Sequence, residues 1–159
     1  MDNIKSHSET PNVNLLFWLP SLTFLLHTIE ELPEFPIWAS KHFGPMSVVE
    51  FALIHIPLIW FVLWVSYRAT VSSSESAWRF WAYAAQWQFA FNAVFHLGAS
   101  AVFGDYSPGM VTAATVALPA TLFMTVACQR LNLLPRANAA LACGVGGAIA
   151  ITAVGWLFI

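Results

Sequence analysis

Charged side chains are scarce throughout this chain, and their scarcity limits what it can fold into. Only 6 Lys and Arg and 8 Asp and Glu occur among its 159 residues, or 9%, against roughly 25% in an ordinary soluble domain. Hydrophobic residues make up 58% of the chain, and its mean hydropathy is +0.68. A soluble globule would have too little polar material to cover so much apolar surface. The sequence therefore predicts an integral membrane protein, located in the cell membrane.

Five apolar segments are each long enough to cross about 30 Å of hydrocarbon as a helix. They lie at Val13–Glu31, Ser47–Tyr67, Arg79–Phe103, Pro108–Gln129 and Ala137–Phe158. Helices are favoured over strands because lipid leaves the amides of an isolated strand unpaired, and the alternation typical of a barrel is absent. Pro20, Pro57 and Pro119 predict kinks within three of the helices. We expect an all-α bundle of five transmembrane helices that forms a single membrane domain over residues 1–159.

The basic residues indicate how the bundle lies in the membrane. The amino-terminal segment and the second and fourth connections share one side, and they carry Lys5, Arg68, Arg79, Arg130 and Arg136. The first connection, on the other side, carries Lys41 alone. Because cytoplasmic loops carry an excess of Lys and Arg, the pattern predicts a cytoplasmic amino terminus and a carboxyl terminus outside.

Several partners and cofactors are not expected. The net charge is −2 and no basic run occurs, which argues against nucleic acid. The Gly144–Gly147 cluster does not follow a strand, so no nucleotide cofactor is expected. Small residues at four-residue spacing in the last span predict close packing within the bundle, with a homo-oligomer through this helix as the alternative. Cys128 and Cys143 lie in apolar segments and are expected to serve packing rather than a disulfide.

Ionisable side chains inside the spans are the candidates for function, since each costs about 2.5–3.5 kcal/mol at a helix centre. His27, Glu30 and Glu31, at positions i, i+3 and i+4, share one face of the first span. Glu50 opens the second span, and His55 lies about a turn and a half deeper. The third span carries a polar stripe at four-residue intervals, formed by Gln88, Asn92, His96 and Ser100.

Three of these groups, His27, His55 and His96, fall in the outer half of the predicted membrane at depths that agree within roughly 10 Å. We therefore infer one polar cavity that opens toward the outer leaflet. Its predicted lining is His27, Glu30, Glu31, Glu50, His55, Asn92 and His96. The alternative is structural pairing between helices, with Glu31 and Glu50 as solvated helix ends. His7 and His42 are expected to be ordinary surface residues.

Two or three imidazoles with two or three carboxylates suit a divalent metal ion, Zn or Fe. His27, Glu30 and His96 are the first-choice ligands, because a His and a Glu three residues apart on a helix is a geometry found in bundle metal sites. His55 and Glu50 are further candidate ligands. Glu31 would be a general base or an extra ligand, with Glu30 and His27 as the other catalytic candidates. Asn92, Gln88 and Tyr106 would orient ligands or contact substrate.

The same residues permit other functions. An enzyme that acts on a small lipid-like or isoprenoid-like substrate is favoured, with membrane lipids as the surroundings. A metal-free isomerase or cyclase would use Glu30 or Glu31 as the acid and His27 as its partner. In architecture, that plan resembles the emopamil-binding sterol isomerases. A metal-ion or proton-coupled transporter is less expected because the inner halves are poor in polar residues. An accessory membrane subunit is the remaining alternative.

The segment from His27 to Glu31 reads H-x-x-E-E, and the chain resembles the HXXEE family of small bacterial and archaeal integral membrane proteins. Three further segments agree with this resemblance. They are Leu32–Trp38, the pair Asn92 and His96, and Asp105–Gly109. The resemblance implies a membrane protein without an established activity, in which His27, Glu30, Glu31 and His96 form one constellation.

Overall fold

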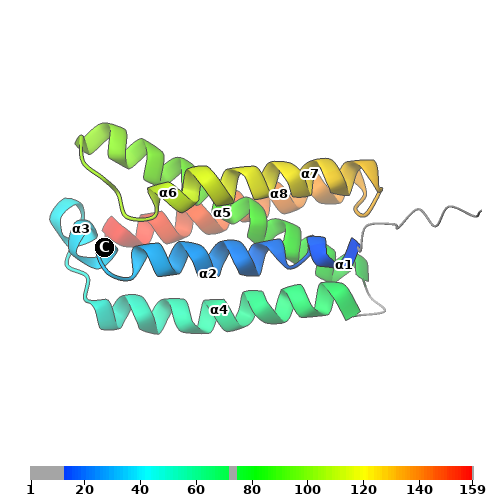
Figure 1. Cartoon of the computed structure of the whole chain (residues 1–159), viewed down its shortest axis with the longest axis horizontal. Helices are drawn as coiled ribbons and strands as arrows, with labels where there is room; N and C mark the ends of the chain where they lie inside the picture. The colour runs from blue at the N-terminus through cyan, green and yellow to red at the C-terminus, as the bar shows by residue number, and fades with distance from the viewer. Residues whose placement is uncertain (1–12, 72–74, 159) are drawn as a thin grey trace, which may run out of the picture.

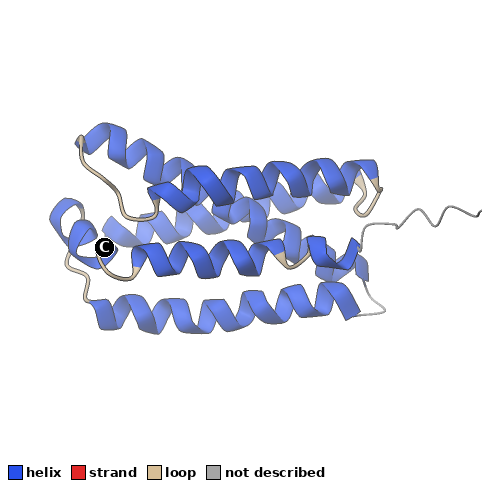
Figure 2. Ribbon diagram, viewed as in Figure 1, coloured by secondary structure: helices blue, strands red, loops and turns tan. Residues whose placement is uncertain are grey.

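The computed structural model describes residues 13–71 and 75–158. Every regular element in these residues is helical, which confirms the predicted all-α class (Figure 2). The helices form an elongated bundle in which each long segment runs opposite to the one before it (Figure 1). Lys5 and His7 lie outside the described residues.

The first segment consists of α1 (Val13–Leu16) and α2 (Leu19–Glu31), and the short α3 (Phe35–His42) leads to α4 (Val48–Val71). The longest helix is α5 (Glu75–Phe103). The next segment joins α6 (Met110–Thr112), a π-helical turn (Ala113–Ala117) and α7 (Leu118–Arg130). The last is α8 (Arg136–Gly155), which ends in a 3-10 turn (Trp156–Phe158).

Three helices among the described residues are long and apolar enough to cross a membrane. They are Val48–Val71, Met110–Arg130 and Arg136–Phe158. The helix α2 has only 13 residues, since the chain turns between it and α1. The helix α5 is long, but the polar stripe found in the sequence lowers its hydropathy. The structure thus has three candidate spans by length and composition.

Two of the three prolines predicted to cause kinks coincide with irregular backbone. The chain leaves helical geometry between α1 and α2, and Pro20 lies in the first turn of α2. Likewise, the π-helical turn ends directly before α7, which has Pro119 in its first turn. Proline cannot donate an amide hydrogen and clashes with the preceding turn, which accounts for both interruptions. Pro57 lies within the unbroken helix α4.

The most extensive helix contact is that of α5 with α8. At Gly146, a Cβ atom would lie 2.5 Å from the Ala84 carbonyl oxygen and 2.8 Å from the Gln88 nitrogen, so the two backbones meet too closely for any side chain. Packing within the bundle is therefore confirmed for this part of the small-residue face. The other part, with Gly144 and Ala148, is exposed, and a homo-oligomer through this helix stays a prediction.

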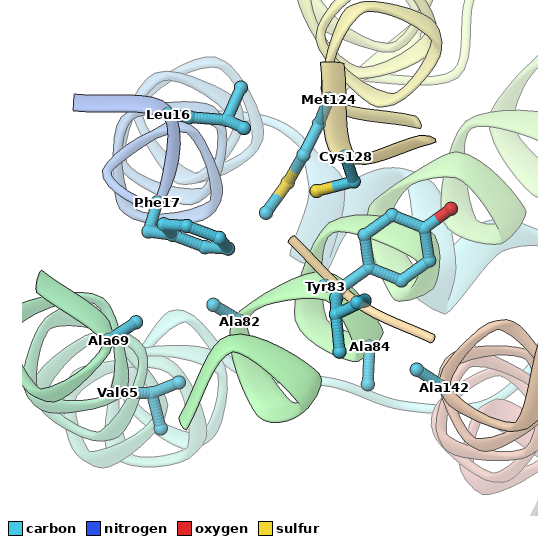
Figure 3. Close-up of a cluster of buried hydrophobic side chains, with 11 residues drawn as sticks. Leu16, Phe17, Val65, Ala69, Ala82, Tyr83, Ala84, Met124, Cys128 and Ala142 are labelled. Atoms are coloured by element: carbon cyan, nitrogen blue, oxygen red, sulfur yellow. The ribbon is translucent and has the colours of Figure 1, made fainter. Parts of the chain in front are cut away.

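Apolar clusters fill both ends of the bundle. At the α1 end, side chains from α1, α4, α5, α7 and α8 meet, with Phe17 and Met124 fully buried (Figure 3). Cys128 belongs to this cluster, and both Cys128 and Cys143 are free thiols, as expected. At the other end, a second cluster gathers around Phe35 and Phe51. The histidines and carboxylates of the candidate site lie at this second end.

Candidate functional site

The carboxylate of Glu31 is the centre of a buried polar group. Glu31 ends α2 and is 4% exposed. Its Oε1 atom lies 3.1 Å from His96 Nε2 and 3.5 Å from His27 Nε2. Its Oε2 atom lies 3.8 Å from His55 Nε2. Three histidines from the three helices α2, α4 and α5 therefore meet at one carboxylate. His27, Glu31 and His96 each place one ligand atom within 4.8 Å of the others, so this group could hold a metal ion.

Helical spacing explains how these side chains meet. His27 and Glu31 are four residues apart on α2, and Asn92 and His96 are four residues apart on α5, so each pair occupies one helix face. The two pairs face each other: the Asn92 amide nitrogen lies 2.8 Å from His27 Nε2, and His96 meets Glu31 one turn further along.

All three imidazoles are held in the same way. His27 Nδ1 lies 2.8 Å from Thr112 Oγ1, and His96 Nδ1 lies 2.9 Å from Ser107 Oγ. His55 Nδ1 donates to the Phe51 carbonyl oxygen over 2.8 Å. In each ring the Nδ1 atom is thereby anchored and Nε2 is directed toward Glu31. Anchoring one ring nitrogen by a hydrogen bond is how proteins orient histidine ligands for a metal ion.

The Nε2 atom of His96 is buried and has no hydrogen-bond partner among the described residues. Although it lies 3.1 Å from Glu31 Oε1, the two atoms are not aligned for a hydrogen bond. If Nδ1 carries the ring hydrogen, the Nε2 lone pair faces a carboxylate oxygen; if Nε2 carries it, a buried donor is left unsatisfied. Either neutral state of the ring is unfavourable in a site of low dielectric. A doubly protonated ring would form an ion pair with Glu31, and a metal cation bound by both atoms would remove the conflict as well.

The backbone at Gly109 closes one side of this group. Gly109 has φ +104°, and a Cβ atom there would lie 2.8 Å from the Cε1 atoms of both His27 and His96. Glycine is the residue that tolerates this conformation, and it alone leaves room for the two rings. The connection between α5 and α6 thus packs directly on the imidazoles that it also anchors.

Glu30 lies outside the group of His27, Glu31 and His96, which corrects its choice as a metal ligand there, and its catalytic role stays a prediction. Its carboxylate accepts hydrogen bonds from the Tyr106 hydroxyl, from Val111 N at 3.0 Å and from Thr112 N at 2.7 Å. These amides open the segment that starts with α6, where a negative charge is favourable. Burial, followed by the Glu30 carboxylate, raises the pKa of Tyr106 to about 12. Through its hydrogen bond to Glu30, Tyr106 helps to hold the segment that starts with α6.

Glu50 also lies apart from the site, and its prediction as a metal ligand is corrected. Its Oε2 atom accepts from Ser47 N at 2.8 Å, and the Glu50 amide donates to Ser47 Oγ at 3.1 Å. This reciprocal pair is a capping box at the start of α4. The exposed Glu50 side chain satisfies helix-terminal amides instead of binding a ligand.

His42 is not an ordinary surface residue, contrary to expectation. Its Nε2 atom lies 2.9 Å from Asp105 Oδ2, and its ring stacks on Phe103 with centroids 4.1 Å apart. Asp105 also accepts from Lys41 Nζ and Trp38 Nε1 at 2.7 and 2.8 Å. The Lys41 ammonium, foremost among these donors, holds the pKa of the Asp105 carboxyl well below its usual range. Asp105 thereby fastens α3 to the loop that carries Ser107.

A cavity of about 550 Å³ reaches the polar group from one side. Most of its lining is aliphatic or aromatic, and its polar lining consists of His27, Glu31, His55, Gln88, Asn92 and Thr152. Gln88 lines the cavity although the predicted lining did not include it. None of the described residues that line the cavity is Lys or Arg.

Several residues of the site were not found from the sequence. Ser107 and Gly109 lie in the loop between α5 and α6, and Thr112 lies in the short helix α6. Of these, the sequence indicates only Ser107 and Gly109, as part of the segment Asp105–Gly109 in the family resemblance. Gln86 is also buried, with its Nε2 atom 3.0 Å from Thr121 Oγ1. A glutamine within an apolar helix was a signal for such a buried partner.

Comparisons with known proteins give one match. The family described as "Protein of unknown function with HXXEE motif" matches residues 18–124, a range that contains Glu31 and the three histidines around it. No curated protein and no solved structure matches the chain.

Proposed function

We propose that the chain, which belongs to the HXXEE family, is a five-span protein of the cell membrane whose His27, Glu31 and His96 hold a divalent metal ion. In this proposal the site serves an enzyme that acts on a small lipid-like substrate. The observation that carries the proposal is the buried Nε2 atom of His96, which has no hydrogen-bond partner among the described residues although it lies 3.1 Å from the Glu31 carboxylate.

The distances within the group support a metal ion. Ligand atoms bound to zinc at 2.0–2.2 Å with tetrahedral angles lie about 3.4 Å apart. The two distances from Glu31 Oε1 are 3.1 Å to His96 and 3.5 Å to His27. Two imidazoles and one carboxylate are the ligands of catalytic zinc with an open position and of non-haem Fe(II). The Asn92 amide donates a hydrogen bond to His27 Nε2. An ion that binds this nitrogen would displace the amide.

Each residue then has a role that its contacts define. An ion held here would polarise a carbonyl or hydroxyl oxygen of the substrate. His55 lies beyond the three ligands, on the cavity side, with Nδ1 anchored and Nε2 3.8 Å from Glu31 Oε2. That placement suits His55 to accept a proton from substrate and to return it. The aromatic rings around the site exclude water from it. The Phe51 and His55 rings stack with centroids 3.7 Å apart, and the centroids of the Phe35 and His96 rings are 5.6 Å apart.

The arrangement of the helices supports five spans. The helices α2 and α5 pack among the three long apolar ones, so their polar side chains have partners within the bundle. The end of α4, the start of α5, the end of α7 and the start of α8 lie at one end of the bundle (Figure 1). These ends carry Arg68, Arg79, Arg130 and Arg136, whereas Lys41 lies on α3 at the opposite end. By the positive-inside rule we place the arginine end in the cytoplasm.

The metal content of the purified protein tests the proposal. We expect stoichiometric Zn or Fe in the wild type and its loss in Glu31→Gln and His96→Gln. Glu34→Gln is the matched control, because Glu34 is exposed three residues beyond Glu31 and should leave the metal content unchanged. Far-UV circular dichroism checks that each variant is folded. A wild type that holds no metal when purified from metal-supplemented medium, or a His96→Gln variant that retains it, would overturn the proposal.

A metal-free acid–base enzyme is the second candidate, and one observation favours it. Glu31 faces three imidazoles at the wall of an apolar cavity, which is an arrangement suited to moving protons without an ion. This candidate predicts that the wild type binds no metal and that chelators leave its turnover unchanged.

A further inference from the structure

The cavity beside Glu31 is open along one side of the bundle. Most of its walls come from α2, α4, α5 and α8, and α3, the connection from α3 to α4 and the last 3-10 turn add Phe35, Met46, Trp156 and Leu157. Both α4 and α8 pack against α5, but among the described residues they are not a packed pair with each other. A cleft therefore separates α4 from α8, with α2 and α5 behind it. We call this the α4–α8 cleft.

Side chains at the mouth of the α4–α8 cleft are apolar and exposed. On α4, Leu58 and Phe61 line the cleft and are 45% and 51% exposed. On α8, Ile149 lines it and is 45% exposed, and in the 3-10 turn that follows α8, Trp156 lines it and is 65% exposed. Both helices are candidate spans, so these side chains would meet the hydrocarbon chains of lipids. The mouth thus opens sideways toward the bilayer rather than toward water.

The inner end of the cleft is polar but lacks cations. It presents the Glu31 carboxylate, the His55 imidazole and the Gln88 and Asn92 amides. A phosphate or diphosphate head group would need Lys or Arg to balance its charge, and none of the described lining residues is either. An ion bound at Glu31 would leave one net positive charge, which is too little for a diphosphate. The lining fits an uncharged oxygen-bearing group such as an alcohol, an aldehyde or an ester.

We propose that the α4–α8 cleft binds a single-chain lipid with an uncharged oxygen-bearing head group, which enters sideways from the bilayer. The chain lies between Leu58 and Ile149, and the head group reaches Glu31 and His55. The cleft volume of about 550 Å³ falls within the range of about 300–1,000 Å³ for small-molecule sites. This inference rests on the proposed function for turnover of the lipid, whereas binding of the chain depends on the cleft alone.

Photolabelling in liposomes tests the binding site. The probe is hexadecanol with a diazirine midway along its chain, and mass spectrometry of peptides maps the labelled residues. We expect labels on the cleft-facing residues of α4 and α8. Excess hexadecanol should remove these labels, whereas hexadecyl phosphate at the same concentration should not. Labels spread evenly over all exposed apolar faces, or equal competition by the phosphate, would overturn the proposal. Cross-contacts between two copies across the cleft would also overturn it, because a second copy would then be the occupant.

A matched pair of variants places the probe within the cleft. Ala153→Trp puts a large side chain into the lining, whereas Ala148→Trp puts the same side chain on an exposed part of α8 outside it. The first variant should abolish competable labelling and the second should preserve it. If Ala153→Trp fails to fold, the competition experiment in the wild type still decides the question.

The labelling can fail or succeed independently of the metal measurement. Labelling of the cleft in a protein without metal would leave this binding site standing and overturn the metal proposal. Stoichiometric metal without labelling of the cleft would overturn this binding site and leave the metal proposal standing.

Discussion

Replacement of Gly109 by alanine should lower the free energy of unfolding, because two separate costs arise at this position. The position has φ +104°, and a non-glycine residue in so sparsely populated a conformation costs about 1–3 kcal/mol. The new Cβ atom would also lie 2.8 Å from carbon atoms of both His27 and His96. Overpacking of this kind costs about 1–3 kcal/mol more. We therefore expect Gly109→Ala to lower the free energy of unfolding by about 2–6 kcal/mol.

Gly104 provides the matched control for this substitution. It also has a positive φ, +71°, but a Cβ atom there would meet nothing within 4 Å. Gly104→Ala should therefore show only the conformational part, about 1–3 kcal/mol. Unfolding of both variants is followed in detergent by circular dichroism, and metal content is measured on the same samples. Metal should be lost in Gly109→Ala only. Equal destabilisation of the two variants, with equal metal content, would show that Gly109 does not limit the space around the imidazoles.

Three further substitutions separate the supporting residues from the site. Glu30→Gln removes the charge that accepts three hydrogen bonds at the start of α6. It should lower the unfolding temperature more than Glu34→Gln does, while the metal stays bound. Loss of metal in Glu30→Gln would show that Glu30 is a metal ligand after all. Ser47→Ala removes the cap of α4 and should cost about 0.5–2 kcal/mol of stability without a change in metal content, so an unchanged melting curve would contradict the capping role. Asp105→Asn addresses pH: because the pKa of the folded Asp105 is lowered, its contribution is present above the usual value of about 3.9 and is lost as pH falls toward the lower folded value. Wild-type stability should accordingly fall more steeply below pH 4 than that of the variant, and parallel curves would refute this.

Helical periodicity was sufficient to predict which polar side chains share one face of a helix. A spacing of four residues puts His27 above Glu31 and Asn92 above His96, whatever the rest of the fold does. The rise of 1.5 Å per residue then brings His55 to the same depth. These quantities depend only on helix geometry and on where each span begins. The meeting of the three imidazoles with a carboxylate at the end of α2 could therefore be anticipated without tertiary structure.

Periodicity could not decide between Glu30 and Glu31. Positions i+3 and i+4 lie on either side of the line through His27, so both were compatible with facing the histidines. The choice depends on which neighbours each carboxylate finds. Glu30 meets the free amides of Val111 and Thr112, and those amides are placed by a loop that no periodic pattern describes. Glu50 was different, since the spacing from Ser47 to Glu50 matches a capping box and could have been recognised.

The two adjacent glutamates of the motif therefore have complementary roles. Glu31 faces the imidazoles directly, whereas Glu30, about 100° around the same helix, fixes the segment that carries Thr112 and Gly109. That segment in turn anchors His27 and closes the site against both imidazoles. The helix that supplies His27 and Glu31 thus also positions the segment that orients the His27 ring. Glu30→Gln and Gly109→Ala therefore act on the same segment, and their effects on the free energy of unfolding should be less than additive when they are combined.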